Sequence, residues 1–162
     1  MPTFETRLAR VVTQKITGCT ELLDVERLSG GASQETYRLT VLLNGVETPL
    51  AMRRTPGGEY VEALPSHPGL DVEALLMQSA KAVGVPEPEV YHVLTREDDL
   101  GDGFIMEWIE GEALGARITR DPQFDAVRPT LARACGEILA RIHGIDLDQS
   151  GLRSRLAELP PK

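Results

Sequence analysis

The pair Asn44-Gly45 restricts the fold of this chain more than any other short feature. Apolar residues alternate over residues 36–43 before the pair, and a second apolar stretch, residues 46–53, follows it. Asn-Gly between two such stretches is the strongest short hairpin signal, because both residues adopt positive φ at low cost. The sequence therefore predicts two neighbouring antiparallel strands over these ranges.

A glycine turn precedes the hairpin and follows a third apolar-polar stretch, residues 22–28. The turn contains Gly30, Gly31, Ala32, Ser33 and Gln34. No bulky side chain covers its crown, so its backbone N–H groups can approach an anion such as phosphate. Taken alone, an ordinary hairpin turn is the stronger interpretation, because the stretch matches neither a Rossmann fingerprint nor a Walker A motif.

Further helices and strands are predicted around these three strands. A short helix begins after Thr3 and ends near Gly18, and a second helix covers residues 71–83 with Glu73 near its start. The predicted packed face of the second helix consists of Val72, Leu75, Leu76, Ser79 and Val83. Two more strands, residues 89–94 and 104–109, flank an acidic turn, 97–103, that we expect to be solvated.

A long helix is predicted after Asp121-Pro122. Its apolar stripe consists of Leu131, Cys135, Ile138, Leu139 and Ile142. Because this spacing places all five side chains on one helix face, we expect the stripe to be core.

Two cations end the third strand. Arg53 and Arg54 stand where an apolar strand meets a Pro/Gly loop. Adjacent strand residues face opposite sides of a sheet, so only one of the two can point beneath the glycine turn. We expect Arg54 to be the one at a solvated strand end.

Composition narrows the function further. The 162 residues carry a formal net charge of −8 and a pI near 4.9, and no basic run is present, which argues against nucleic acid as a partner. Cys19 and Cys135 lack any metal-ligand spacing, which fits a reducing compartment. No apolar signal region or membrane-length stretch is found, so we expect a cytoplasmic protein that binds small molecules and no membrane.

The order of these elements resembles the upper lobe of kinase-like enzymes. It is similar to the aminoglycoside phosphotransferase and choline kinase-like family, most closely to the branch related to the kinase-like domain of acyl-CoA dehydrogenase family members. The segments that carry the resemblance are residues 28–39, 51–54, 84–88, 106–111 and 139–143.

The resemblance implies an α+β fold with a protein-kinase-like N-lobe. That lobe, with its N-terminal helix, would span residues 1–109 and contain a five-stranded antiparallel sheet with a packed αC-type helix. Residues 110–120 would form the hinge or linker, and residues 121–162 the first helix and start of a helical C-lobe.

The resemblance also implies an ATP site. Residues 30–34 would cover the nucleotide phosphates with backbone donors, and Arg53 would stand where kinases usually carry a lysine. Glu73 would be the helix carboxylate that pairs with this cation. Met106 would lie at the back of the adenine pocket, while the backbone of Glu107 and Ile109 would supply an acceptor and a donor to the adenine edge.

The catalytic segment of such enzymes is not recognised in this sequence. Kinase-like enzymes need a catalytic Asp, an Asn that helps hold Mg²⁺ and a second metal-binding Asp, whereas the single Asn of this chain is Asn44, in the hairpin turn. The stretch His143 to Asp146 differs from the family's His-Gly-Asp triplet by an inserted Ile. We therefore expect the ligands of Mg²⁺ and the site for a small-molecule hydroxyl substrate to lie outside this chain, and the chain alone to be inactive.

Two other interpretations stay open on the sequence alone. One is a free-standing, non-catalytic module that binds a nucleotide or regulates another protein with a kinase-like upper lobe. The other is an unrelated α+β domain in which the glycine hairpin is fortuitous.

Overall fold

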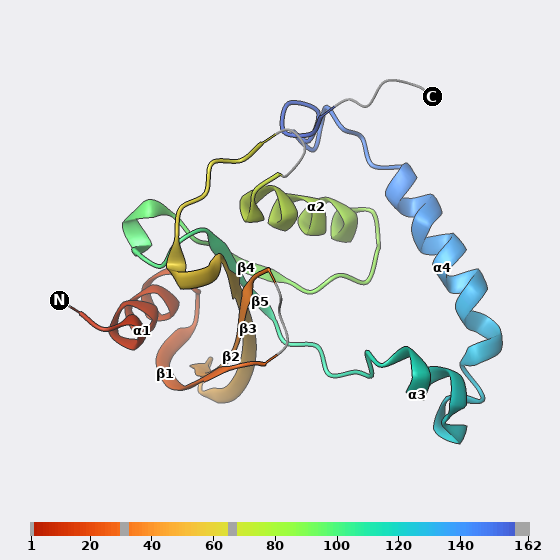
Figure 1. The fold of residues 1–162 in the computed structure, drawn as a ribbon, viewed down its shortest axis with the longest axis horizontal. Helices are drawn as coiled ribbons and strands as arrows, with labels where there is room; N and C mark the ends of the chain where they lie inside the picture. Colours follow the sequence, from red (N-terminus) through yellow and green to blue (C-terminus); the bar gives the residue numbers. More distant parts are fainter. Residues whose placement is uncertain (1, 30–32, 65–67, 158–162) are drawn as a thin grey trace.

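A computed structural model describes residues 2–29, 33–64 and 68–157. Its centre is an antiparallel sheet of five strands in the order β1-β2-β3-β5-β4 (Figure 1). The strands are β1 (Cys19–Arg27), β2 (Glu35–Leu43), β3 (Val46–Arg54), β4 (Val90–Val93) and β5 (Gly103–Glu107). This confirms the predicted α+β fold and the five-stranded sheet of a kinase-like upper lobe.

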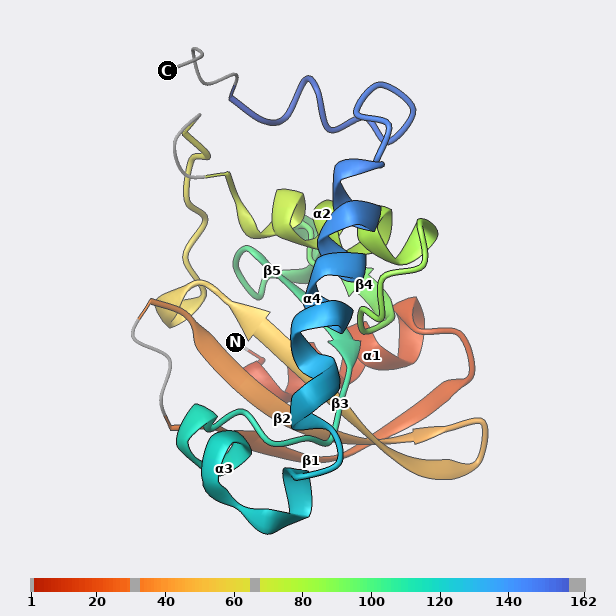
Figure 2. The same ribbon diagram turned by 90° about the vertical axis from the view of Figure 1, so that its right-hand side faces the viewer.

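Helices lie on both faces of the sheet and beyond it. They are α1 (Phe4–Lys15), α2 (Leu70–Ala82), α3 (Gly115–Arg120) and α4 (Arg128–His143), with single 3-10 turns at Pro56–Gly58, Arg96–Asp98 and Pro122–Phe124. The chain leaves β5, passes through α3 and returns along α4 toward the C-terminal end of α2, as Figures 1 and 2 show. There Arg141 donates a hydrogen bond of 2.7 Å to the carbonyl oxygen of Gly84.

Strand alternation divides the buried side chains into two cores. Tyr37, Met52 and Ile105 align across β2, β3 and β5 and pack in the core that α1 covers. Phe104 belongs to the smaller core on the other face, beneath Leu70 and Ala74 of α2. Because β5 is buried on both faces, its sequence is apolar almost without interruption.

Local signals in the sequence explain the first elements. Thr3 caps α1, and its hydroxyl oxygen accepts a hydrogen bond of 3.2 Å from the N–H of Thr6. Gly18 follows the helix with φ of 82°, and Asn44 and Gly45 form the turn between β2 and β3 with φ of 52° and 78°. Both turn predictions are confirmed.

The packed face of α2 differs from the predicted one. Val72 and Ser79 are buried as expected, but Val83 is 36% exposed and lies just beyond the helix. Leu75 and Leu76 are half-buried. The side that contacts the sheet is instead centred on Leu70 and Ala74, because it is the side that lies over Phe104 and Val90.

The acidic turn before β5 is not fully solvated, contrary to prediction. Asp98 is only 2% exposed and caps its own turn, where its carboxylate accepts hydrogen bonds of 2.8 Å from the N–H of Thr95 and 3.1 Å from its hydroxyl. His92 Nε2 lies 2.8 Å from the same carboxylate. Burial acts to raise the pKa of Asp98, but the bonds from Thr95 and the contact with His92 outweigh it and lower the pKa.

The stripe of α4 is also not core within this chain. Leu131, Leu139 and Ile142 are 37%, 52% and 40% exposed, Cys135 is exposed and Ile138 is half-buried. The helix lies to one side of the sheet and of α2 (Figure 1), and none of its residues is buried. Amphipathic spacing predicted the helix correctly, but spacing does not state which surface lies opposite the apolar face.

One predicted strand was too long. β5 ends at Glu107, so Trp108 and Ile109 belong to the connection that follows. Within the part of the chain that the structure describes, no helix is long and apolar enough to cross a membrane.

Candidate functional site

Arg53 lies on the face of the sheet that α2 covers. In the register of the sheet it is aligned with Thr36 on β2 and Phe104 on β5. The next row on the same face contains Ala51 and Met106, which are aligned with each other. The end of β3 therefore presents a cation beside the start of β2, which is where the chain leaves the glycine turn.

Glu73 forms an ion pair with Arg53. Glu73 stands in the first turn of α2 and accepts a hydrogen bond from Arg53 Nη1. The side chains of Arg53 and Glu73 are 33% and 34% exposed, so solvent reaches the pair and screens it. The arrangement holds a guanidinium in place while leaving part of it accessible to a ligand.

Gln34 contacts the same guanidinium. Its side-chain oxygen accepts a hydrogen bond from Arg53 Nη2, while Ser33 and Gln34 border a surface hollow of about 410 Å³. The hollow extends between the end of β3, at Thr55, and the start of α2, at Leu70. The exit of the glycine turn, the end of β3 and the start of α2 thus meet around one cation.

The crown of the turn lies outside the described residues. Gly30, Gly31 and Ala32, which were predicted to approach phosphate, belong to the undescribed part. At the base of the turn, the N–H of Leu28 donates a hydrogen bond of 2.9 Å to the carbonyl oxygen of Thr36. This bond joins the flanking strands where the turn begins and ends.

Arg54 is buried on the opposite face, which corrects the expectation of a solvated strand end. It is 9% exposed and donates hydrogen bonds of 2.8 Å to the Glu35 carboxylate, 3.0 Å to the Tyr37 hydroxyl and 3.2 Å to the carbonyl oxygen of Leu100. Its guanidinium carbon also lies 4.3 Å from the centre of the Phe4 ring. The two arginines face opposite sides of the sheet, as predicted. The face of Arg54 is covered by α1 and is not exposed to solvent.

Glu35 is the centre of this buried polar cluster. Its carboxylate accepts a hydrogen bond of 2.8 Å from the Tyr37 hydroxyl and one of 3.3 Å from the N–H of Gly57. Burial acts to raise the pKa of Glu35, but these two bonds and the contacts with Arg54 outweigh it and lower the pKa. Burial and the bond to Glu35 raise the pKa of Tyr37.

The cluster of Glu35, Tyr37 and Arg54 was not predicted from the sequence. Glu35 and Tyr37 are two residues apart on β2 and so share a face, and the Asn44-Gly45 hairpin sets Glu35 opposite Arg54. Counting residues outward from the Asn44-Gly45 turn would have predicted that Glu35 lies opposite Arg54. The fact that the face is buried depends on α1, whose position the sequence did not reveal.

The predicted adenine-edge residues lie at and beyond the end of β5. Met106 packs against the core beneath α2, and the N–H of Glu107 donates a hydrogen bond of 2.8 Å to the carbonyl oxygen of Glu89. Ile109 follows the strand and is 59% exposed. The side chain of Trp108 lies under Arg38, whose guanidinium carbon is 5.1 Å from the ring centre.

Most of the chain matches a known family. Residues 24–161 match the model of the phosphotransferase enzyme family. The chain belongs to this family. Acyl-CoA dehydrogenase family member 10 of Mus musculus is 29% identical over 143 residues, which cover 85% of this chain but only 12% of the mouse protein. The resemblance stated from the sequence is confirmed at the level of family and branch.

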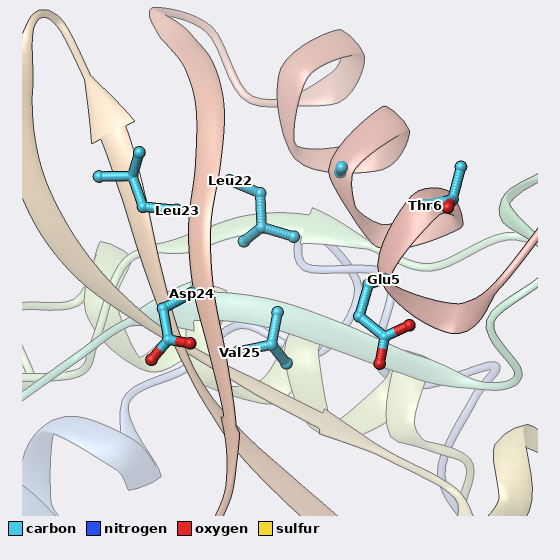
Figure 3. Close-up of a pocket in the computed structure, with 7 residues that line it drawn as sticks. Glu5, Thr6, Leu22, Leu23, Asp24 and Val25 are labelled. Carbon is cyan, nitrogen blue, oxygen red and sulfur yellow. The ribbon is translucent and has the colours of Figure 1, made fainter.

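The surface has hollows other than the one beside Gln34. One such hollow, of about 420 Å³, lies between α1 and the edge strand β1. Figure 3 shows Glu5 and Thr6 on the helix side, with Leu22, Asp24 and Val25 on the strand side. It adjoins the α1 side of the sheet, whereas Arg53 faces α2, so the two regions are separate.

The acidic residues near Arg53 do not form a metal centre by themselves. Among residues 2–29, 33–64 and 68–157, no group of three or more His, Cys, Asp or Glu side chains is arranged to hold a metal ion. The charge that the described site offers to an anionic ligand is therefore that of the guanidinium.

Proposed function

We propose that this chain forms the ATP-binding part of a small-molecule phosphotransferase. The observation that carries the proposal is the placement of Arg53, which is paired with Glu73 and lies beside the exit of the glycine turn. Family membership supports phosphoryl transfer as the reaction class. Transfer would proceed from ATP to a hydroxyl group of a small molecule.

Arg53 would bind the nucleotide phosphates. A guanidinium carries a permanent charge and donates two parallel hydrogen bonds, which suits a phosphate group. Glu73 would fix the orientation of the guanidinium, as a carboxylate does for the lysine of other kinases. Residues 30–34 would cover the phosphates with backbone N–H donors, and the small residues of the turn permit that approach.

The base of ATP would bind at the end of β5. Met106 lies on the same face of the sheet as Arg53, one row further along the strands, so base and phosphates would occupy neighbouring parts of one surface. The carbonyl oxygen of Glu107 and the N–H of Ile109 would contact the adenine edge. Recognition would then depend on backbone groups and tolerate changes of the Ile109 side chain.

The remaining components would come from residues outside 1–162. Magnesium, when bound, neutralises charge on the phosphate oxygens, and we assign its ligands and the acceptor site to a segment outside this chain. Residues 1–109 would act as the upper lobe, 110–120 as the hinge and 121–162 as the start of the lower lobe. The chain alone would bind nucleotide and transfer no phosphate.

Titration of the chain with MgADP, followed by NMR or calorimetry, tests the proposal. We expect weak binding, with a dissociation constant between about 10 μM and a few mM, because the metal ligands are missing. Arg53→Ala should weaken this binding about tenfold or more, because a charge-assisted contact is lost. Arg120→Ala, on the exposed end of α3, is the matched control and should bind like the unmodified chain.

Two outcomes would contradict the proposal in different ways. Equal binding by the Arg53→Ala and Arg120→Ala variants would show that nucleotide does not use this cation. A submicromolar affinity, worth more than about 8 kcal/mol, would show a complete site in the chain alone and favour a free-standing nucleotide-binding module.

A further inference from the structure

Gln34 is the residue immediately before β2. Within that strand, Thr36 is aligned with Arg53. Gln34, two residues before Thr36, lies in a bend and not in the strand, and its side chain contacts Arg53.

Two groups bind the nitrogen atoms at the end of Arg53. Glu73 accepts from Nη1 and Gln34 accepts from Nη2. The carboxylate of Glu73 already balances the charge of the guanidinium, while Gln34 contributes a neutral amide oxygen. Both bonds have a charged donor, but only the bond to Glu73 adds the attraction of an opposite charge, so the contact with Gln34 is the weaker of the two.

We propose that the amide oxygen of Gln34 occupies the place on Arg53 that a phosphoryl oxygen of the nucleotide takes. The inference rests on the proposed function. Binding of nucleotide displaces the weaker, neutral acceptor and leaves Glu73 in place. Gln34 thus occupies a donor on Arg53 Nη2 when no ligand is present and acts as a competitor that lowers affinity for phosphate.

The surroundings of Gln34 permit this exchange. Gln34 borders the hollow of about 410 Å³ between the end of β3 and the start of α2, so the released side chain has space to occupy without disturbing the core. Arg53 is one-third exposed, which allows an anion to reach it from solvent. A fully buried glutamine would not have this freedom.

Two probes and four variants test the inference in the chain as it exists. MgADP and inorganic tripolyphosphate are titrated into the unmodified chain and into Gln34→Ala, Gln34→Glu, Arg53→Ala and Gln14→Ala. Gln14 lies exposed on α1 and is the matched control for loss of a glutamine. Side-chain N–H resonances of Arg53 are recorded before any probe is added.

The inference predicts a definite order of affinities. Gln34→Ala should bind both probes about two- to tenfold more tightly, because a competing acceptor is removed. Gln34→Glu should bind them about tenfold or more weakly, because a carboxylate adds the attraction of an opposite charge to its bond with Arg53 and repels phosphate. Gln14→Ala should bind like the unmodified chain. Before any probe is added, Gln34→Ala and Gln34→Glu should shift the side-chain resonances of Arg53. Gln14→Ala should leave them unchanged.

Different failures are distinguishable. If the unmodified chain binds the probes and Gln34→Ala weakens binding as much as Arg53→Ala, Gln34 is a ligand of phosphate and not a competitor. If Gln34→Ala leaves the affinities and the Arg53 resonances unchanged, the contact has no such role. Both results overturn the inference and leave the proposed function intact, whereas binding of neither probe to the unmodified chain overturns the proposed function and the inference with it.

Discussion

Arg53 and Arg54 are neighbours in sequence, but β3 gives them opposite surroundings. Arg53 meets Glu73 and Gln34 at a partly exposed surface. Arg54 is enclosed by Glu35, Tyr37 and the ring of Phe4. The same kind of side chain is therefore partly accessible on one face and buried on the other, and substitutions of their partners should have different effects.

Glu73→Gln should change binding more than stability. An ion pair at this exposure contributes only about 0–1 kcal/mol to folding, so urea unfolding should shift by no more than that. MgADP affinity should fall several-fold, because Arg53 loses the charge that orients it. Glu89→Gln breaks the exposed pair with Lys81 and serves as control, and equal losses of stability and of binding in Glu73→Gln would assign Glu73 to structure.

Glu35→Gln should destabilise the chain by about 1–3 kcal/mol near neutral pH, because the charge that pairs with buried Arg54 is lost. The pKa of Glu35 is lowered by folding from an ordinary value of 4.5, so the unfolded chain binds its proton first as the pH falls. The contribution of Glu35 is therefore complete above that value and is lost as the pH falls through the folded pKa.

Urea unfolding at several pH values measures this effect. The stability gap between the unmodified chain and Glu35→Gln should stay constant at pH values well above the ordinary Glu value of 4.5 and narrow as the pH falls below it. Glu26→Gln, at an exposed position of β1, should show no comparable gap. A gap that is constant over the whole range would mean that the loss comes from packing and not from the charge of Glu35.

At the level of elements, Gly58 and Gly101 permit a close approach of the backbone after β3 to the backbone before β5. Gly101 has φ of 86°, and a Cβ there would overlap the backbone of Gly58. Nearby, the N–H of Thr55 donates a hydrogen bond of 2.9 Å to the carbonyl oxygen of Asp102. The loop after Arg54 and the turn before β5 therefore pack backbone against backbone.

Gly101→Ala should be more harmful than Gly45→Ala. Gly45 has φ of 78°, but a Cβ added there would meet nothing within 4 Å, so its substitution should cost only about 1–2 kcal/mol for the backbone conformation. Gly101→Ala adds a steric clash and should cost about 3 kcal/mol or more. Thermal or urea unfolding compares the two variants, and equal losses would show that the contact with Gly58 relaxes easily.

For the whole molecule, local patterns predicted the elements better than their environments. The Asn44-Gly45 pair specified the β2-β3 register, and strand alternation predicted that Arg53 and Arg54 face opposite sides of the sheet. Burial of Arg54 and Asp98, in contrast, depends on α1 and on a cap that forms within the 3-10 turn after β4. Exposure of the α4 stripe likewise depends on what lies opposite the helix, and periodicity carries no information about that.

The site shows the same division. The resemblance to kinase-like enzymes implied the pair of Arg53 and Glu73, which the structure contains, whereas register and spacing alone did not single out Glu73. The contact of Gln34 with Arg53 was not foreseen, since that turn was interpreted through its backbone donors alone. The roles of these residues toward nucleotide stay predictions until binding is measured.

The chain of residues 1–162 should transfer no phosphate to any acceptor. Transfer requires a carboxylate that takes the proton of the hydroxyl group and ligands that hold metal against the phosphate oxygens. No three-residue acidic, His or Cys cluster is arranged for metal among the described residues, and Asn44 lies in the turn distant in register from Arg53. An ADP-release assay with MgATP and a panel of aminoglycosides, choline and sugar alcohols should stay at the level of the buffer.

Turnover that persists through purification and disappears in Arg53→Ala would mean that the chain alone is a complete enzyme. Turnover that requires a separately expressed second segment would instead place the catalytic carboxylates in that segment.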